Sequence, residues 1–384
     1  MKIVVAPDSF KGSISARDIC TAVEKGVLRV FPQASVVRLP LADGGEGTLD
    51  NLVFASGGTK FEVKVKGPLG KPVKASIGIL GDEETAVIEM AQASGLPLVS
   101  EDEKNPLLAT SYGTGELIKY ALDRNYRKFI IGLGGSATND GGTGMLKALG
   151  VRFLNSDGKE LPEGGGALLS LDHFDDSDLD PRIKESSFLI ASDVTNPLCG
   201  LNGASAIFGP QKGASTEDVT LLDQALLNFS EITQKQKEID LCQIVGGGAA
   251  GGMGAALVAF LDASIQSGID VIMEAIKFEE IIKDANFIIT GEGKLDSQTL
   301  SGKVIAGVSK VAKKRRIPVI ALCGGLQINS TQMDELGIIG GFSIVPGPCS
   351  LESAMQNSAK WTEERTEQIL RITKVFYRLG EEGL

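Results

Sequence analysis

Carboxylates, lysines and glycines follow apolar runs at five places along the chain. In open α/β sheets, ligands bind outside the carboxyl ends of strands, where loops and helix N-termini offer unpaired N–H groups. Asp, Ser and Gly are also ordinary turn and capping residues, but five such segments together favour one shared ligand site. The segments are APDSFKG (6–12), LADGGEGT (41–48), GLGGSATND (132–140), SDVTNP (192–197) and TGEGKLD (290–296).

The carboxylates in these segments would repel one another at a shared site unless cations lay between them. That combination suits a nucleotide bound with Mg²⁺. The carboxylates in question are Asp8, Asp43, Glu46, Asp140, Asp193, Glu292 and Asp296.

The chain has a single histidine, His173, in a polar segment. One imidazole argues against a Ser-His-Asp triad, a Cys-His pair and histidine-rich metal sites. Carboxylates and lysines must therefore carry any chemistry. Phosphoryl transfer fits them, because it depends mainly on positioning and charge neutralisation, and an aspartate can take the acceptor's hydroxyl proton.

The glycine-rich segment 132–144 does not match a Walker A loop, and SGKV at 301–304 lacks the upstream glycine and the Ser/Thr of that motif. Gly132, Gly134 and Ala137 do fit a loose G-x-G-x-x-A pattern, with Asp157 about twenty residues further on. This leaves an NAD(P)-dependent hydroxy-acid dehydrogenase as an alternative. In a chain with 48 glycines such matches arise by coincidence, and a dehydrogenase of this kind usually needs a histidine.

The elements that must position these residues alternate at both ends of the chain. The first sixty residues predict strand, helix, strand and helix, with Ser13 or Ser15 capping the first helix, and the same alternation returns after about residue 285. From Lys60 onward, alternating apolar and polar residues broken by Gly-Pro and Gly-Asp turns predict antiparallel hairpins. A terminal helix is expected from about Leu351 to Leu379.

The predicted fold class is α/β with two domains. Residues 1–60 and 286–384 would form a Rossmann-like, doubly wound parallel sheet from both chain ends. Residues 61–285 would form an inserted mixed α/β domain, with the active-site cleft between the two domains.

The formal net charge of −11 argues against nucleic acid and anionic membrane surfaces as partners. Five cysteines without a CxxC spacing, and no run of eighteen apolar residues, favour a cytoplasmic protein. The oligomeric state is left open between a monomer and a homodimer.

Several long motifs, in their order along the chain, resemble the bacterial glycerate kinases of the glycerate 2-kinase type. They are APDSFKGSISA, PLADGGEGT, GLGGSATNDGGTG, DVTNPLCGLNGASAIFGPQKGA, GAAGGMGAAL and TGEGKLDSQTLSGK. The resemblance covers nearly the whole chain and implies two α/β domains. It also implies that ATP, with Mg²⁺, phosphorylates D-glycerate, giving 2-phospho-D-glycerate or, as the alternative, 3-phosphoglycerate.

With this resemblance in hand, we assign expected roles to individual residues. Asp193 is the expected base, with Lys212 and Asp8 as further catalytic residues. The residues expected to bind glycerate are Ser9, Lys11, Asn196 and Lys303. The residues expected to bind ATP are Gly134, Gly135, Ser136, Asn139, Glu292 and Asp296. Asp43 and Glu46 are expected either to hold Mg²⁺ or to orient Lys11.

Overall fold

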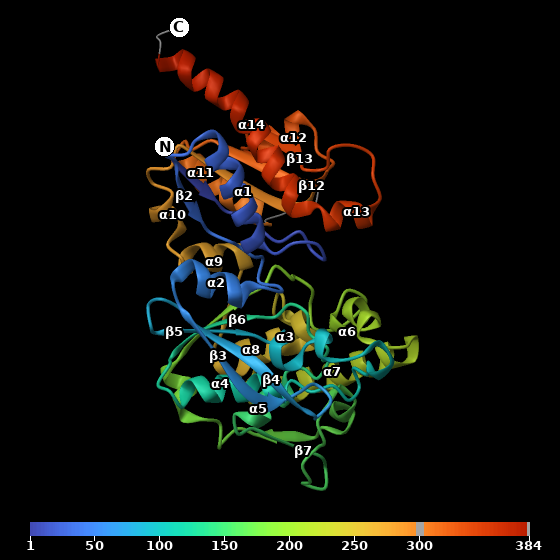
Figure 1. Cartoon of the computed structure of the whole chain (residues 1–384). Helices are drawn as coiled ribbons and strands as arrows, with labels where there is room; N and C mark the ends of the chain where they lie inside the picture. The colour runs from blue at the N-terminus through green and yellow to red at the C-terminus, as the bar shows by residue number, and fades with distance from the viewer. Residues whose placement is uncertain (297–302, 382–384) are drawn as a thin grey trace. The chain divides into compact units, whose positions relative to one another are not determined.

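The computed structural model describes residues 1–296 and 303–381, and its contacts divide the chain into two units (Figure 1). The terminal unit comprises Met1–Asp43 and Ile269–Leu384, and the central unit comprises Gly44–Gly268. Both units combine helices with a largely parallel sheet, so the predicted α/β class with two parts is confirmed.

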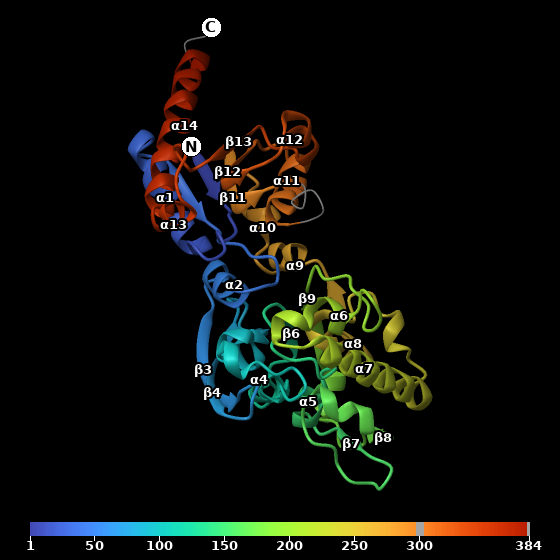
Figure 2. The same ribbon diagram turned by 90° about the vertical axis from the view of Figure 1, so that its right-hand side faces the viewer.

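In its described residues, the terminal unit has a five-stranded parallel sheet in the order β13-β12-β11-β1-β2. Helices α1 and α14 cover one face of this sheet, while α11 and α12 lie on the other, as expected of a doubly wound arrangement (Figure 2). The strands are β1 (Lys2–Val5), β2 (Ser35–Arg38), β11 (Phe287–Leu295), β12 (Val319–Leu326) and β13 (Gly340–Ser343). The helices are α1 (Ala16–Val30), α10 (Phe278–Ile281), α11 (Val304–Lys314), α12 (Ser330–Leu336), α13 (Leu351–Gln356) and α14 (Ser358–Glu381), together with α9 (Gly268–Ala275) at the boundary.

Local sequence explains where these helices begin and end. Ser15 caps α1, as predicted, because its side chain accepts a hydrogen bond from the Asp18 N–H. The predicted single terminal helix is wrong, since the chain forms two helices separated at Asn357. The side-chain amide of Asn357 donates to the Ser353 carbonyl at 2.8 Å and thereby competes with a continuous helix.

The described part of the central unit contains a six-stranded sheet in the order β10-β9-β6-β5-β4-β3 and a separate pair, β7-β8. Strands β5, β6, β9 and β10 are parallel, whereas β3, β4 and β5 form the predicted antiparallel hairpins. The strands are β3 (Thr59–Lys66), β4 (Pro72–Ile79), β5 (Thr85–Glu89), β6 (Lys128–Gly132), β7 (Arg152–Leu154), β8 (His173–Asp175), β9 (Ser187–Ala191) and β10 (Ser264–Gln266).

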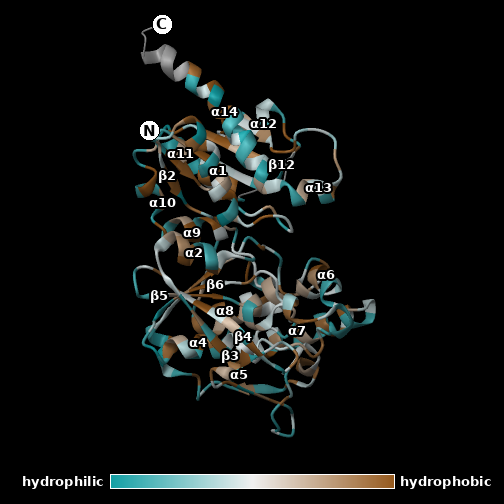
Figure 3. Cartoon of the chain, in the orientation of Figure 1, coloured by the Kyte–Doolittle hydropathy of each residue, from teal (hydrophilic) through white to brown (hydrophobic). Residues whose placement is uncertain are grey.

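The apolar side chains of the central unit form one continuous core between its sheet and its helices (Figure 3). Phe129 and Phe188 stack on neighbouring strands with ring centroids 4.6 Å apart, and α8 is apolar around nearly its whole circumference. A helix that is apolar on all sides is typical of a protein interior. The helices are α2 (Thr48–Ser56), α3 (Ala91–Ser94), α4 (Tyr112–Leu122), α5 (Thr143–Ala148), α6 (Ala204–Phe208), α7 (Thr216–Lys237) and α8 (Met253–Leu261).

The boundaries between the units fall at 43/44 and 268/269 instead of the predicted 60/61 and 285/286. Helix α2 belongs to the central unit because it packs against β4 and β5. Helix α9 packs on α11 of the terminal unit, where Ile269 and Met273 lie against Gly307. Across residues 1–296 and 303–381, no helix combines the length and the apolar character needed to cross a membrane.

Candidate functional site

In the terminal unit, three of the predicted segments meet at the carboxyl end of the parallel sheet. Strands β1 and β11 are neighbours, and the Asp8 N–H donates to the Gly291 carbonyl at 2.8 Å. The Leu41 N–H donates to the Pro7 carbonyl at 2.9 Å, which brings the segment leading to Asp43 to the same edge. The structure therefore places Asp8, Asp43 and Glu292 at one edge of this unit.

Asp8 is a buried carboxyl group at this edge with a strongly raised pKa. Its residue is only 7% exposed, and burial followed by the nearby Asp43 carboxylate raises the pKa of Asp8 to about 7. Glu292, itself buried, adds to the increase, while the Ser9 N–H at 2.6 Å and Lys11 oppose it. Asp8 thus changes its charge near neutral pH, a property that suits proton transfer.

Lys11 pairs with Asp43, with its ammonium nitrogen 3.4 Å from a carboxylate oxygen. This carboxylate raises the pKa of Lys11, whose side chain is 76% exposed. Of the two predicted roles for Asp43, the contact supports orientation of Lys11. Of the other residues predicted in this unit, Asp296 pairs with Lys294 at 2.9 Å, and the half-buried Lys303 directly precedes α11.

In the central unit, the two remaining predicted segments and the second part of LADGGEGT lie close together at the ends of β6 and β9. A Cβ atom added to Gly134 would lie 2.7 Å from the Gly45 Cα, and one added to Gly44 would lie 2.5 Å from the Ala191 carbonyl oxygen. Glycine is needed at both positions because a side chain would collide with backbone. The loop at 44–47 therefore lies against the glycine-rich segment and against the residues that precede Asp193.

Most of the glycine-rich segment is buried inside the central unit. The Lys212 ammonium donates to the Ser136 hydroxyl at 2.8 Å and to the Thr138 carbonyl at 2.7 Å. The Asn139 amide donates to the Ser205 hydroxyl at 2.9 Å. Burial lowers the pKa of Lys212 to about 7, although nearby Asp140 opposes this change. The side chains predicted to hold phosphate thus already have partners within the unit.

Gly134 and Gly135 differ from the residues that follow them. Gly134 is half-buried and Gly135 is exposed, whereas residues 136–144 are buried. Gly141 lies against Phe229, and Gly142 lies against Met253, so these later glycines serve close packing. The backbone at Gly134 and Gly135 is the part of the segment that a ligand can reach directly.

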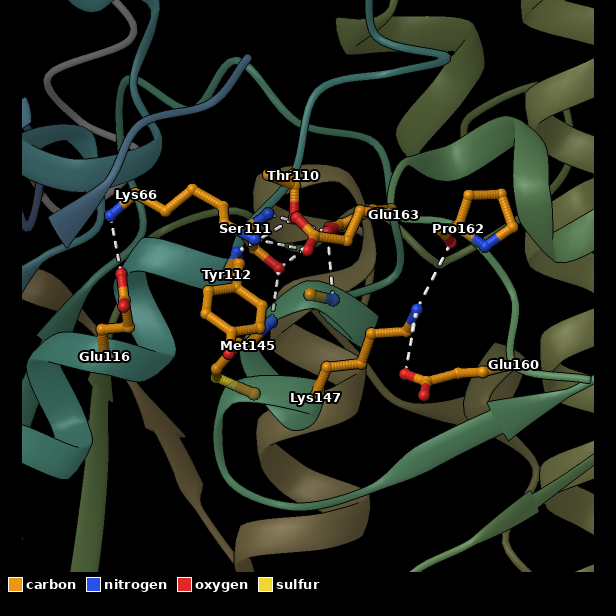
Figure 4. Close-up of polar contacts among 12 residues, drawn as sticks. Lys66, Thr110, Ser111, Tyr112, Glu116, Met145, Lys147, Glu160, Pro162 and Glu163 are labelled. Atoms are coloured by element: carbon orange, nitrogen blue, oxygen red, sulfur yellow. Dashed lines mark hydrogen bonds and ion pairs between the residues drawn. The ribbon is translucent and has the colours of Figure 1, made fainter. Parts of the chain in front are cut away.

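Asp140, which was counted among the carboxylates of the expected site but was given no role of its own, anchors the segment from within. It is fully buried, and one of its carboxylate oxygens accepts hydrogen bonds from the Ser111 N–H and hydroxyl at 2.8 Å each. The Ser111 hydroxyl in turn accepts a bond from the Met145 N–H at 2.9 Å (Figure 4). Burial raises the pKa of Asp140, and its hydrogen bonds oppose that increase. The Gly141-Gly142 pair that follows Asp140 was the feature of the sequence that could have indicated this structural role.

Glu89 was missed as a site residue. It ends the buried strand β5, and its carboxylate accepts a hydrogen bond from the Leu49 N–H, in the first turn of α2, at 2.8 Å. Burial raises the pKa of Glu89, whereas the Leu49 N–H acts in the opposite direction. A charged residue closing the run TAVIE was the signal that pointed to it.

The remaining predicted residues of the central unit lie near its surface. Asp193 is exposed, and its carboxylate accepts a hydrogen bond from the Gly268 N–H at 3.1 Å. Asn196 donates to the Asn202 carbonyl at 2.9 Å, which fixes the turn that follows Asp193. Glu46 is exposed in the loop before α2.

Among the residues that the structure describes, no group of three or more His, Cys, Asp or Glu side chains is arranged to hold a metal ion. Mg²⁺ commonly binds to one or two carboxylates together with substrate phosphates. The carboxylates at the two sheet edges are donors of that chemical type, and they fit a metal that arrives with a nucleotide.

The loose dinucleotide fingerprint lacks its structural context. A Rossmann fingerprint requires a strand, a helix and a second parallel strand in the same sheet. Here β6 leads through α5 to β7, which pairs antiparallel with β8 in a separate sheet. Asp157 is exposed on the loop after β7. This geometry disfavours the dehydrogenase.

The structure defines an α/β protein in which the candidate ligand-binding groups of each unit lie at the carboxyl ends of parallel strands. The model of the glycerate kinase family matches residues 3–374. The chain is 48% identical to a glycerate kinase of Bacillus subtilis, over 98% of each chain, and 49% identical to a glycerate 2-kinase of Escherichia coli, over 93% of this chain and 94% of the other.

A solved structure agrees with these relatives. It is a "putative glycerate kinase 2" from Salmonella typhimurium LT2, which matches with a TM-score of 0.89 and 45% identity over 98% of this chain and 99% of the other. The protein belongs to the glycerate kinase family.

Proposed function

We propose that the protein is a glycerate kinase that transfers the γ-phosphoryl group of ATP to the 2-hydroxyl of D-glycerate. The observation that carries this proposal is the agreement with the family over residues 3–374, together with 49% identity to a glycerate 2-kinase. The polar groups at the sheet edges support it, since they are carboxylates and lysines, which phosphoryl transfer uses.

The attacking hydroxyl of glycerate must lose its proton, and we propose Asp8 as the group that takes it. A carboxyl group with a pKa of about 7 is both partly ionised and basic enough to accept a proton at neutral pH. Asp193, which the sequence analysis favoured, is the second candidate. Its exposed carboxylate would orient the substrate if Asp8 is the base.

The carboxylate of glycerate needs cationic or N–H partners in a protein with a formal net charge of −11. Lys11 is suited to this role because its side chain is exposed and Asp43 holds it in place. Ser9, Asn196 and Lys303 remain the other proposed contacts to glycerate.

For ATP, we propose that the backbone N–H groups of Gly134 and Gly135 contact phosphate oxygens, because this part of the glycine-rich segment is accessible. Lys212 and Asn139 would hold the glycine-rich segment in position through their hydrogen bonds to Ser136, Thr138 and Ser205. Glu292 and Asp296 remain proposed nucleotide contacts.

Glu46 is a proposed ligand of Mg²⁺, and Asp43 is proposed as a second one, as the alternative to orienting Lys11. The ion, when bound, neutralises charge on the phosphate oxygens. Substitutions of the two carboxylates should have different effects. Replacing exposed Glu46 would affect only the binding of Mg²⁺, whereas replacing Asp43 would also remove the ion pair with Lys11.

The proposal is tested by following ADP formation from ATP with and without D-glycerate, in the presence of Mg²⁺ or of a chelator. We expect glycerate-dependent ADP that the chelator abolishes. Asp8→Asn should lower kcat by about 10²–10⁴-fold if Asp8 is the base. The matched control is Asp157→Asn, at an exposed carboxylate that is distant in sequence from Asp8, and it should leave kcat unchanged.

A pH profile separates the two candidate bases. If Asp8 takes the proton, kcat/KM should rise through about pH 7, and this limb should vanish in Asp8→Asn. A normal limb in Asp8→Asn, with its loss in Asp193→Asn, would assign the base to Asp193. Absence of glycerate-dependent ADP from the wild-type protein would refute the kinase itself.

A further inference from the structure

The loop between β1 and α1 carries three residues of the proposed site, Asp8, Ser9 and Lys11, and it closes in a tight turn over residues 10–14. The Phe10 N–H donates to the Ile14 carbonyl at 3.0 Å, and the Ile14 N–H donates back to the Phe10 carbonyl at 3.1 Å. Phe10 is buried in the core of the terminal unit and anchors the base of the turn. Lys11 therefore lies near the tip of this turn, which we call the Lys11 turn.

The Ser13 hydroxyl joins the Lys11 turn to the break between α13 and α14. Ser15 is the cap of α1, which leaves the Ser13 hydroxyl for another contact. This hydroxyl lies 3.0 Å from the Met355 carbonyl oxygen and 3.0 Å from the Ser358 hydroxyl, which is itself 3.0 Å from the same carbonyl. The three oxygen atoms form a triangle that two hydroxyl protons hold together.

The break at Asn357 makes the Met355 carbonyl available for this contact. Helix α13 ends one residue after Met355, and the last carbonyls of a helix have no partner within it. The Ser353 carbonyl of the same turn accepts a bond from the Asn357 side chain at 2.8 Å, and the two hydroxyls serve Met355. In a continuous helix the Met355 carbonyl would instead accept the N–H four residues further on.

Helix α14 gives the oxygen triangle a firm support. Ser358, its first residue, is 4% exposed. Further along, α14 packs closely on α1, where a Cβ atom added to Gly26 would lie 2.6 Å from the Glu363 carbonyl oxygen. The Met355 side chain also lies against the turn, since a Cβ atom added to Gly12 would lie 3.3 Å from its Cε atom. A polar and an apolar contact thus tie the Lys11 turn to helices near the far end of the chain.

We propose that Ser13 and Ser358 are positioning residues that hold the Lys11 turn in the conformation that binds the carboxylate of glycerate. Both hydroxyls act through Lys11, whose ammonium also pairs with Asp43 at 3.4 Å. The lysine side chain is long and 76% exposed, so a fixed backbone reduces the entropy that Lys11 loses when it binds an anion. This role deepens the proposed function and rests on it, whereas the ordering of the turn does not.

The kinetic effect follows from the part of glycerate that Lys11 would bind. The carboxylate of glycerate does not react, so its contact with Lys11 is present in the ground state and in the transition state alike. Loss of such a contact raises KM and leaves kcat unchanged. Ser13→Ala removes the hydroxyl from the triangle, and the net contribution of one hydrogen bond corresponds to about 3–10-fold in an equilibrium constant. KM for glycerate should therefore rise by about 3–10-fold, with KM for ATP unchanged.

The test measures kcat and KM for glycerate, at saturating ATP and Mg²⁺, in the wild type and in four variants. Ser13→Ala and Ser358→Ala should both raise KM for glycerate, whereas Ser13→Thr keeps the hydroxyl and should keep the wild-type value. The matched control is Ser35→Ala, at an exposed serine of β2 in the same unit, which should leave KM unchanged.

Lys11→Met decides whether Ser13 acts through the lysine. This variant should raise KM for glycerate by itself, and Ser13→Ala added to it should raise KM no further, because two residues that act through one contact are not additive. A second rise of the same size would overturn the proposal. An unchanged KM in Ser13→Ala would also overturn it, even if the melting temperature of that variant falls.

Hydrogen exchange of peptides that cover residues 8–15 reports on the turn without any turnover. The Ser13 and Ile14 N–H groups donate to the Phe10 carbonyl at 2.8 and 3.1 Å. Their exchange should be about 3–10-fold faster in Ser13→Ala, and unchanged exchange would overturn the proposal. If the wild-type protein shows no glycerate-dependent ADP formation, the proposed function fails, but the exchange still decides whether the triangle orders the turn.

Discussion

Lys212 gives the central unit a pH-dependent stability that can be measured directly. The residue is 2% exposed, and burial lowers the pKa of its ammonium group from 10.5 to about 7. Between pH 7 and pH 10.5 Lys212 therefore binds more protons in the unfolded chain than in the folded protein, with a difference that approaches one proton within this range. The free energy of unfolding must rise with pH in this range, because the unfolded state binds more protons.

The size of the effect follows from the two pKa values. From pH 7 to pH 8.5 the Lys212 contribution to the free energy of unfolding should rise by about 1.6 kcal/mol, since the folded group is half-ionised at pH 7 and mostly neutral at pH 8.5. Replacement by methionine, Lys212→Met, should abolish this rise. It also removes the bonds to Ser136 and Thr138, at a cost that does not depend on pH.

The assay is urea denaturation of wild type and Lys212→Met across this pH range, with hydrogen exchange of peptides from 129–146 as the local readout for the central unit. Other titrating groups, including the buried Cys20 and Cys323, are common to both proteins and cancel in the difference. Lys159→Met, at a lysine whose side chain is 78% exposed, is the matched control. A stability difference between the two proteins that stays constant from pH 7 to pH 8.5 would show that burial does not lower the pKa of Lys212.

Three further predictions concern single side chains. Gly134→Ala should lower glycerate-dependent turnover at least tenfold, because the new methyl group would sit 2.7 Å from the Gly45 Cα, while Gly347→Ala, which meets nothing within 4 Å, should be neutral in the same ADP assay. Asp140→Asn should lower the melting temperature by about 5–15 °C in a thermal scan, because an amide nitrogen would face buried N–H donors, and an unchanged value would contradict the anchoring role. The free energy of unfolding of the wild type should fall as the pH rises from about 4 to 7, since the folded protein keeps a proton on Asp8 that the unfolded chain has released. Asp8→Asn should remove this fall. Urea titrations that show the same pH dependence in both proteins would count against the raised pKa of Asp8.

Sequence alone predicted those parts of the fold that depend on local patterns. The alternation of strands and helices at both chain ends, the hairpins after Lys60 and the cap at Ser15 are all present. Their signals lie within a few residues, so periodicity and capping chemistry suffice. The break at Asn357 was missed because an asparagine inside an amphipathic pattern does not by itself end a helix.

Boundaries and burial could not be predicted in the same way. Helix α2 belongs to the central unit because of its contacts with β4 and β5, which follow it in the sequence. Nothing local distinguishes Gly134, which a ligand can reach, from Gly141, which packs on Phe229. Lys212 was expected to be a catalytic residue. Lysine is rarely buried, and the bonds of Lys212 to the glycine-rich segment depend on tertiary structure.

The candidate site was predicted as a set of segments more successfully than as a set of roles. Within each unit, parallel strands bring their carboxyl ends to one edge of the sheet, and the polar segments of that unit lie there; the single shared site stays a prediction. The near-neutral pKa of Asp8 depends on burial and on Asp43, which lies on another segment, so no reading of its neighbours in sequence could reveal it.

The most direct test of the central claim is the identity of the phosphorylated product. Purified protein should be incubated with D-glycerate, ATP and Mg²⁺, and the product followed by phosphorus and proton NMR. We expect a phosphomonoester coupled to the proton on C2. Coupling to the C3 protons would make the enzyme a glycerate 3-kinase, and absence of any glycerate phosphoester would contradict the assignment of kinase activity.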